Sequence, residues 1–373
     1  MAGVDIEVAR AALVVGLVIT ALIYHRTTIL SGGAVTGSYL ALMVMGGAWD
    51  TIAGWAILSL IGYAAISLAS QWLPFPRAWL FAIGVIVPAA IHTLGVMAAG
   101  IPAFSGLTAF LVAGLYVTNG LTAYDAKRQG ILKTVLGVLA VVGLTLAILV
   151  PLQWAMDRFA RDERILSEVS LDSPLVILLC IVTALAVRLG LRWGTAGIVG
   201  SLFLVDLLSL SSLLVILGFT LVGTVIYRAV AKTMGLTPRE RLYSLLAVGS
   251  IVSWFGLFWA SWLGIPGAEA AERFAVEPLL VIGLMIGETQ RFGLGRTLGG
   301  TAIVGVVTWC AQVLFEANPS GAWWIFVVLL IPATVLMVFA TRSMVAEWRA
   351  AIAGGEVWGT PRPLIAPKRG KKR

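Results

Sequence analysis

The feature that most constrains this chain is a series of long, almost uninterrupted apolar runs. Thirteen runs stand out, at about 9–25, 31–48, 52–70, 78–98, 107–124, 134–153, 174–189, 194–211, 213–231, 243–263, 277–289, 297–316 and 322–341. A helix needs about 20 predominantly apolar residues to cross the hydrocarbon core of a bilayer. The runs are continuously apolar and do not alternate, which favours helices over a β-barrel. We therefore predict an all-α polytopic membrane protein with about thirteen transmembrane helices, within limits of roughly twelve and fourteen.

Composition agrees with lipid as the solvent. Of the 373 residues 60% are hydrophobic and only 12% are charged, whereas a soluble domain is about a quarter charged. Cys180 and Cys310 both lie inside apolar runs, so we expect buried, unreactive thiols and not a disulfide or metal pair. The first run lacks a strongly basic leader and a clear cleavage site, and we expect it to be retained as a membrane helix.

The distribution of basic residues predicts a topology. With the N-terminus outside and the C-terminus cytoplasmic, all but five of the 26 Lys and Arg residues fall on the inner side, as the positive-inside rule requires. We therefore expect a multi-pass protein of a bacterial plasma membrane. The basic tail, 342–373, ends in PKRGKKR and suits anionic lipids of the inner leaflet; docking of a cytoplasmic partner is the alternative. We do not interpret the basic charge as nucleic-acid binding.

An offset of 163 residues aligns the chain with itself. Ile19-Thr-Ala-Leu22 then falls on Val182-Thr-Ala-Leu185, Gly37-Ser38 on Gly200-Ser201, and Lys133-Thr134 on Arg296-Thr297. Apolar bias alone does not align Gly, Thr and Arg, so we predict an internal duplication. The predicted units are a six-helix repeat (1–155), a polar linker (156–173), a second six-helix repeat (174–316), an extra helix (317–341) and the tail (342–373). Six spans separate equivalent points, so the copies are expected to be parallel, unlike inverted-repeat transporters.

Each copy contains a run of small residues where a membrane helix should begin. SGGAVTGSYLAL (31–42) has its counterpart in GTAGIVGSLFLV (194–205). One interpretation is helix packing, because small residues let membrane helices approach closely. The other is a break in the helix that exposes backbone amides to a substrate beside protein or water. The residues concerned are Gly32, Gly33, Gly37, Gly194, Gly197 and Gly200.

A second motif is also present twice, as GLTAYDAKRQGILKT (120–134) and GLMIGETQRFGLGRT (283–297). An acid and an Arg three residues apart share a helix face and can pair. The motif is a capped inner loop in the simpler interpretation, and a cationic vestibule for an anion in the other, because Arg and carboxylate are geometrically matched. The anion-path candidates are Arg128, Lys133, Arg291 and Arg296; the loop acids are Asp125 and Glu288; the loop glycines are Gly120, Gly130, Gly283 and Gly293.

Motifs for bond-making chemistry were not found in the sequence. It has no phosphate-binding GxxxxGK[ST] loop, no HExxH and no Cys/His metal spacing, and its only histidines are His25 and His92. We therefore expect no catalytic residue, no cofactor and no metal. Asp206 and His92 lie inside apolar runs, and an ionisable group at that depth is a functional candidate. Neither has a counterpart in the other copy, so we expect structural pairing or snorkelling.

TTILSGGAVTGSYLAL with the downstream GLTAYDAKRQG resembles the PgsC/CapC family, the small membrane subunit of poly-γ-glutamate (capsule) synthases. The second copy keeps the pattern more loosely, with Leu202 for Tyr39, Gly287 for Tyr124 and Phe292 for Gln129. The chain thus resembles two fused family units.

The resemblance implies a non-catalytic subunit of an ATP-dependent amide ligase complex. Its partners would be a synthase subunit related to Mur ligases and a membrane-anchored accessory subunit, and the chain would anchor the ligase and guide an anionic polymer across the membrane. Two alternatives remain: a stand-alone secondary transporter or flippase for an anionic solute, and a structural membrane scaffold.

Overall fold

The computed structural model describes residues 6–72, 75–99, 109–159, 174–198, 200–207, 210–233, 238–272, 274, 276–317 and scattered positions between 328 and 345. Most of the predicted extra helix (317–341), most of the polar linker (156–173) and nearly all of the basic tail (342–373) lie outside these residues.

All regular secondary structure in the described residues is helical. The first half contains α1 (Ile6–Thr27), α2 (Thr36–Met45), α3 (Trp49–Trp72), α4 (Arg77–Ala99), α5 (Ala109–Gln129) and α6 (Ile131–Phe159). The second half contains α7 (Pro174–Ala186), a π-helix that continues it (Val187–Leu191), α8 (Gly200–Leu207), α9 (Leu210–Thr233), α10 (Pro238–Trp262), α11 (Ala268–Glu272), α12 (Glu277–Phe292) and α13 (Leu294–Ala317). The prediction of an all-α fold is confirmed.

Eight helices among the described residues are long and apolar enough to cross a membrane: α1, α3, α4, α6, α7 with its π-helical end, α9, α10 and α13. The chain is therefore a multi-pass membrane protein, and the count of thirteen spans stays a prediction. The largest differences from the predicted spans are at α2 and α8. With ten and eight residues, these helices rise about 15 and 12 Å, roughly half of the hydrocarbon core. The small and polar residues before each of them stand in irregular backbone.

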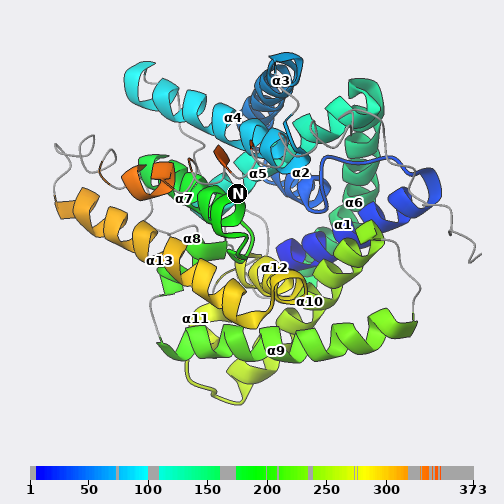
Figure 1. The fold of residues 1–373 in the computed structure, drawn as a ribbon. Coiled ribbons are helices and arrows are strands. Elements are labelled where there is room, and N and C mark those ends of the chain that lie inside the picture. Colours follow the sequence, from blue (N-terminus) through cyan, green and yellow to red (C-terminus); the bar gives the residue numbers. More distant parts are fainter. Residues whose placement is uncertain are drawn as a thin grey trace, which may run out of the picture.

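The principal helix contacts are the same in each half. In the first half α3, α4 and α5 pack on one another, while α6 packs on α1 and α2. In the second half α9, α10 and α12 pack on one another, while α13 packs on α7 and α8. Figure 1 shows the first trio at the top and the second at the bottom, with α1 and α6 to the right and α7 and α13 to the left. The contacts between halves are reciprocal too: α1 packs on α10 and α7 packs on α4.

Burial separates central helices from peripheral ones. Two thirds of the most apolar stretch of α7 is buried, and most side chains of α12 are buried as well. In α3, α6 and α9 the buried share is less than a third. Their outward side chains are large and apolar, including Leu60, Leu139 and Val225. Such a surface is suited to contact with lipid acyl chains and not with water.

Candidate functional site

The backbone break of the second half lies between the π-helix and α8. The chain has positive φ at Arg192 (56°), Ala196 (53°) and Gly197 (68°), so the helix cannot continue through this segment. A Cβ built at Gly197 would lie 2.6 Å from Cδ1 of Leu284 on α12, so this position combines a glycine conformation with a close helix contact.

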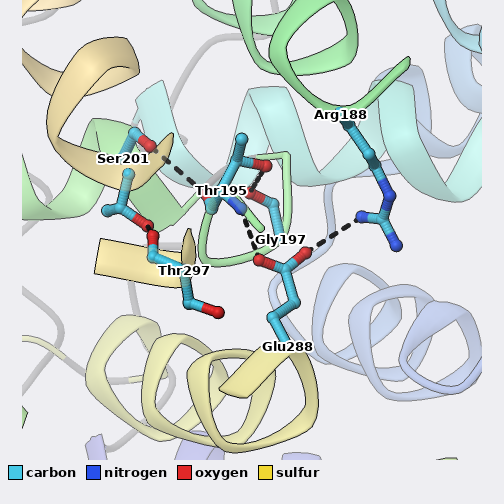
Figure 2. Close-up of polar contacts among 7 residues, drawn as sticks. Arg188, Thr195, Gly197, Ser201, Glu288 and Thr297 are labelled. Atoms are coloured by element: carbon cyan, nitrogen blue, oxygen red, sulfur yellow. Dashed lines mark hydrogen bonds and ion pairs between the residues drawn. The ribbon is translucent and has the colours of Figure 1, made fainter. Parts of the chain in front are cut away.

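Glu288 of α12 holds this break in place. Its Oε2 accepts a hydrogen bond of 2.5 Å from the backbone N–H of Thr195, and its Oε1 accepts one of 3.0 Å from Nη1 of Arg188 (Figure 2). The Glu288 side chain is 7% exposed and that of Arg188 is 30% exposed. The carboxylate thus satisfies an amide that the broken helix leaves without a helical partner, and the cation compensates its buried charge.

Hydroxyl groups complete the hydrogen bonding of the second break. Thr195 Oγ1 donates to the carbonyl of Gly197 at 3.0 Å, and Ser201 Oγ donates to the carbonyl of Thr195 at 3.3 Å (Figure 2). Gly194 fits tightly here, because a Cβ would lie 2.7 Å from Oε2 of Glu288 and 2.9 Å from Oγ1 of Thr297. Irregular backbone at membrane depth requires such internal partners, since no water is available in the hydrocarbon region.

The break of the first half, residues 28–35, is held by an amide side chain instead. Gln129 Oε1 accepts from the N–H of Leu30 at 2.9 Å, and its Nε2 donates to the carbonyl of Leu30 at 2.6 Å and to Thr134 Oγ1 at 2.9 Å. The carbonyl of Gly32 accepts from the hydroxyls of Thr36 and Thr122. The backbone has positive φ at Thr28 (58°), Gly32 (74°) and Gly33 (105°).

One glycine on the long helix after each basic turn lets that helix approach the break. A Cβ at Gly137 of α6 would lie 2.9 Å from the carbonyl oxygen of Leu30. A Cβ at Gly300 of α13 would overlap the carbonyl oxygen of Gly194. In both halves the backbone of this helix therefore packs directly against the backbone of the break, as small residues permit in membrane helix packing.

Several of the other predicted glycines also make close helix contacts, whereas Gly130 and Gly293, at the two turns, have no atom within 4 Å of their Cβ positions. Gly37 meets Val141 of α6, and Gly33 meets Leu121 of α5. Gly120 of α5 packs against Val85 and Gly84 of α4, Gly283 of α12 lies against Gly249 of α10, and Gly200 begins α8. Gly33 and Gly37 do not share a helix, because α2 begins at Thr36. Both interpretations of the small residues, packing and a helix break, thus describe parts of what is observed.

The four anion-path candidates lie at two equivalent turns and are all exposed. Gly130 (φ 95°) joins α5 to α6 between Arg128 and Lys133, and Gly293 (φ 88°) joins α12 to α13 between Arg291 and Arg296. The guanidinium of Arg128 lies 5.7 Å from the ring centre of Tyr124, and that of Arg291 lies 5.0 Å from the ring centre of Phe292. Cationic groups so placed can bind carboxylates that approach this end of the molecule.

The loop acids and the two isolated ionisable residues differ in setting. Asp125 and Glu288 are both buried, and Glu288 pairs with Arg188 of the π-helix after α7, although the spacing suggested Arg291. His92 Nδ1 lies 2.6 Å from the hydroxyl of Tyr116, so it has the structural partner that we expected. Asp206 lies in α8, and its side chain is not among the described ones.

Sequence reasoning missed Arg188, Thr195 and Gln129 as residues that hold the breaks. Arg188 enters the sequence-based topology simply as one of the inner basic residues, although its place just before the small-residue run is a usable signal. Gln129 was noted only as part of the Gln-Gly pattern. Within the described part of the chain, no group of three or more His, Cys, Asp or Glu side chains could hold a metal ion.

Comparison with known proteins gives one match. No curated protein and no solved structure matches the chain. The family model described as Capsule biosynthesis CapC matches residues 15–135. The matched stretch contains the first break, α2 and the turn from α5 to α6. Over residues 15–135 the resemblance to the CapC family of capsule biosynthesis is therefore confirmed.

Proposed function

We propose that the chain is the membrane subunit of a complex that makes and exports poly-γ-glutamate or a similar anionic poly-amino-acid. The observation that carries this proposal is the CapC match over residues 15–135. In this proposal the chain is not itself the catalyst. It anchors an ATP-dependent amide ligase related to Mur ligases, works with a membrane-anchored accessory subunit, and guides the polymer across the bilayer.

We further propose that the chain is two fused CapC-like units in parallel orientation. Four observations support this: the offset of 163 residues, the same helix contacts in each half, a break before each half-length helix, and a basic turn after each of α5 and α12. Within the breaks the offset between the halves is 164 residues and not 163. The wider turn of the π-helix at Val187–Leu191 accommodates this one extra residue. Thr28, Gly32 and Gly33 have positive φ, as do the residues 164 positions later: Arg192, Ala196 and Gly197.

The proposed role of the two basic turns is to receive the polymer. A polymer with one carboxylate per residue carries a high density of negative charge, and Arg can hold both oxygens of a carboxylate. Arg128 and Lys133 in one turn, and Arg291 and Arg296 in the other, are exposed and face the side to which the positive-inside rule assigns the cytoplasm. They would raise the local concentration of the anionic chain at the entrance.

Charge reversal tests the anion path. We expect the double variant Arg128→Glu, Arg291→Glu to lower polymer export at least tenfold in cells that contain the complete synthase, because repulsion replaces attraction at both turns. The ligase should still co-purify with the variant. The matched control is Arg77→Glu, an exposed cation in the first turn of α4, which should export normally.

Two outcomes would contradict this role. Normal export by the double variant would exclude an anion path through these turns. Loss of ligase co-purification in the double variant, with Arg77→Glu unaffected, would favour a scaffold whose basic turns bind the partner protein.

A further inference from the structure

A cavity of about 400 Å³ lies in the first half, between α2, α3, α5 and α6. It is bounded almost entirely by apolar side chains and extends from Trp49 and Ile52 at one end of α3 to Ile131 at the start of α6. Its volume is within the range of pockets that hold small ligands, roughly 300–1,000 Å³. An apolar space of this size suits an apolar occupant better than water, because water gains few hydrogen bonds there.

The cavity opens toward the surface that faces lipid. Leu60 of α3 and Leu139 of α6 both line it, and they are 58% and 60% exposed. The mouth therefore lies between two helices whose outer faces are large apolar side chains. The back wall consists of buried residues, among them Trp55 of α3 and Ala123 and Ala126 of α5. An acyl chain can enter such a cavity sideways from the bilayer.

A cation lies at the inner end of the cavity, where α5 ends. Lys127 is exposed, and its Nζ lies 3.5 Å from Oγ of Ser67, one helical turn beyond the cavity-lining Tyr63. Arg128 and Lys133 belong to the same turn of the chain. A phosphate at this position would have its acyl chain directed along the apolar walls, and a lysine near an anionic headgroup contributes favourably to binding.

At two aligned positions of the back wall the second half has bulkier side chains. With the offset of 163, Thr122 and Ala123 of the back wall align with Met285 and Ile286 of α12. Ile286 is fully buried and lies against Gly223 of α9. At these two positions of α12 the side chains are larger than their counterparts on α5, and Ile286 lies against Gly223, which aligns with Leu60 at the mouth of the cavity.

We propose that this cavity binds one acyl chain of an anionic phospholipid from the leaflet at the α5–α6 turn, with Lys127 holding the phosphate. The site differs from the proposed polymer entrance, since its walls are apolar and open to lipid. A lipid bound here would support the back wall of α5, and α5 leads directly into the first basic turn.

The test uses the full chain in nanodiscs of dioleoylphosphatidylglycerol and dioleoylphosphatidylcholine, with a trace of phosphatidylglycerol that has a photoreactive acyl chain. We expect cross-links on cavity-lining residues of α3, α5 and α6. Ala56→Trp at the mouth should lower them at least fivefold, whereas Ile57→Trp, on the neighbouring exposed face of α3, should not. Ala126→Leu is a second filling variant, and the melting temperature of each variant checks folding.

Lys127→Gln tests the headgroup. We expect the preference for phosphatidylglycerol over phosphatidylcholine at the cavity to fall about fivefold, the effect of one lysine near an anionic headgroup. Arg77→Gln is the matched control and should leave the preference unchanged. Any one of four results would overturn the proposal. Two concern labelling: equal labelling of the cavity and the Ile57 face, or unchanged labelling in both filling variants. The other two are an unchanged lipid preference in Lys127→Gln, and occupation of the cavity by a helix of a co-purifying protein.

Discussion

At the residue scale, a few side chains allow broken helices to exist inside an apolar fold. In the second half Glu288 accepts a hydrogen bond from the amide of Thr195, and Arg188 donates to the same carboxylate. In the first half Gln129 satisfies both backbone groups of Leu30. An unsatisfied amide in a low-dielectric interior costs several kcal/mol. These side chains therefore contribute to stability by their backbone contacts.

The first prediction concerns Glu288. Glu288→Ala removes the acceptor for Thr195 and leaves Arg188 without its partner, so we expect a loss of roughly 1.5–3 kcal/mol, the range for a hydrogen bond to a charged group. Glu288→Gln keeps an acceptor oxygen and should lose less. The measurement is thermal unfolding in detergent, followed by tryptophan fluorescence. Asp50→Ala, at an exposed acid in the first turn of α3, is the control and should melt like the unmodified chain. Equal melting temperatures for Glu288→Ala and Asp50→Ala would show that Glu288 does not hold the break.

The sequence allowed part of this site to be predicted. The basic turns with Gly130 and Gly293, and Gly37 with Gly200, recur at an offset of 163, whereas Gly33 and Gly197 of the breaks recur at 164; the repetition is what marks these residues in the sequence. The partner of Glu288 could not be identified from the sequence, because the spacing of three residues favoured Arg291 on the same helix. The tertiary fold instead brings Arg188, near the start of the π-helix, beside Glu288 of α12. Pairs formed across a backbone break are not visible in local spacing.

At the scale of helices, the half-length α2 and α8 are the features that define the fold. Each is preceded by irregular backbone and packs most extensively against one long helix, α6 or α13. Hydropathy predicted full spans at 31–48 and 194–211 because small and polar residues lower the mean hydropathy only slightly. The conformations that end the helix, such as positive φ at Thr28, Arg192 and Ala196, have no residue signature of their own.

The second prediction concerns the contact between α13 and the second break. Gly300→Ala places a methyl group against the carbonyl of Gly194, so we expect destabilisation of about 1–3 kcal/mol from overpacking. Gly295→Ala is the matched control on the same helix, because no atom lies within 4 Å of its Cβ position. There alanine should be neutral or stabilising by up to about 1 kcal/mol, as its helix propensity implies. If Gly300→Ala and Gly295→Ala shift the melting temperature by the same amount and in the same direction, the close contact at Gly300 is contradicted.

At the scale of the whole molecule, two sets of helices pack reciprocally, with α1 on α10 and α7 on α4. His25 at the end of α1 also lies 2.7 Å from Glu240 at the start of α10, which joins the halves near the basic turns. The apolar runs were sufficient to predict an all-α membrane protein. The number of spans was harder to predict. The helices α2 and α8 are apolar but half the length of a span, and α5 is long enough but less apolar than the eight candidate spans.

The central claim is that two parallel units place their basic turns on the same side of the membrane. The most direct measurement is labelling of single cysteines by a membrane-impermeant maleimide in oriented vesicles. Cys180 and Cys310 are first replaced by Ala, which leaves no other cysteine. Lys133→Cys and Arg296→Cys report on the two turns, and Trp49→Cys, at the exposed start of α3, reports on the opposite side.

We predict that cysteines at 133 and 296 react only in inside-out vesicles and that a cysteine at 49 reacts only in right-side-out vesicles. Reaction of the cysteines at 133 and 296 from opposite sides would contradict the account, because it would require an inverted and not a parallel repeat.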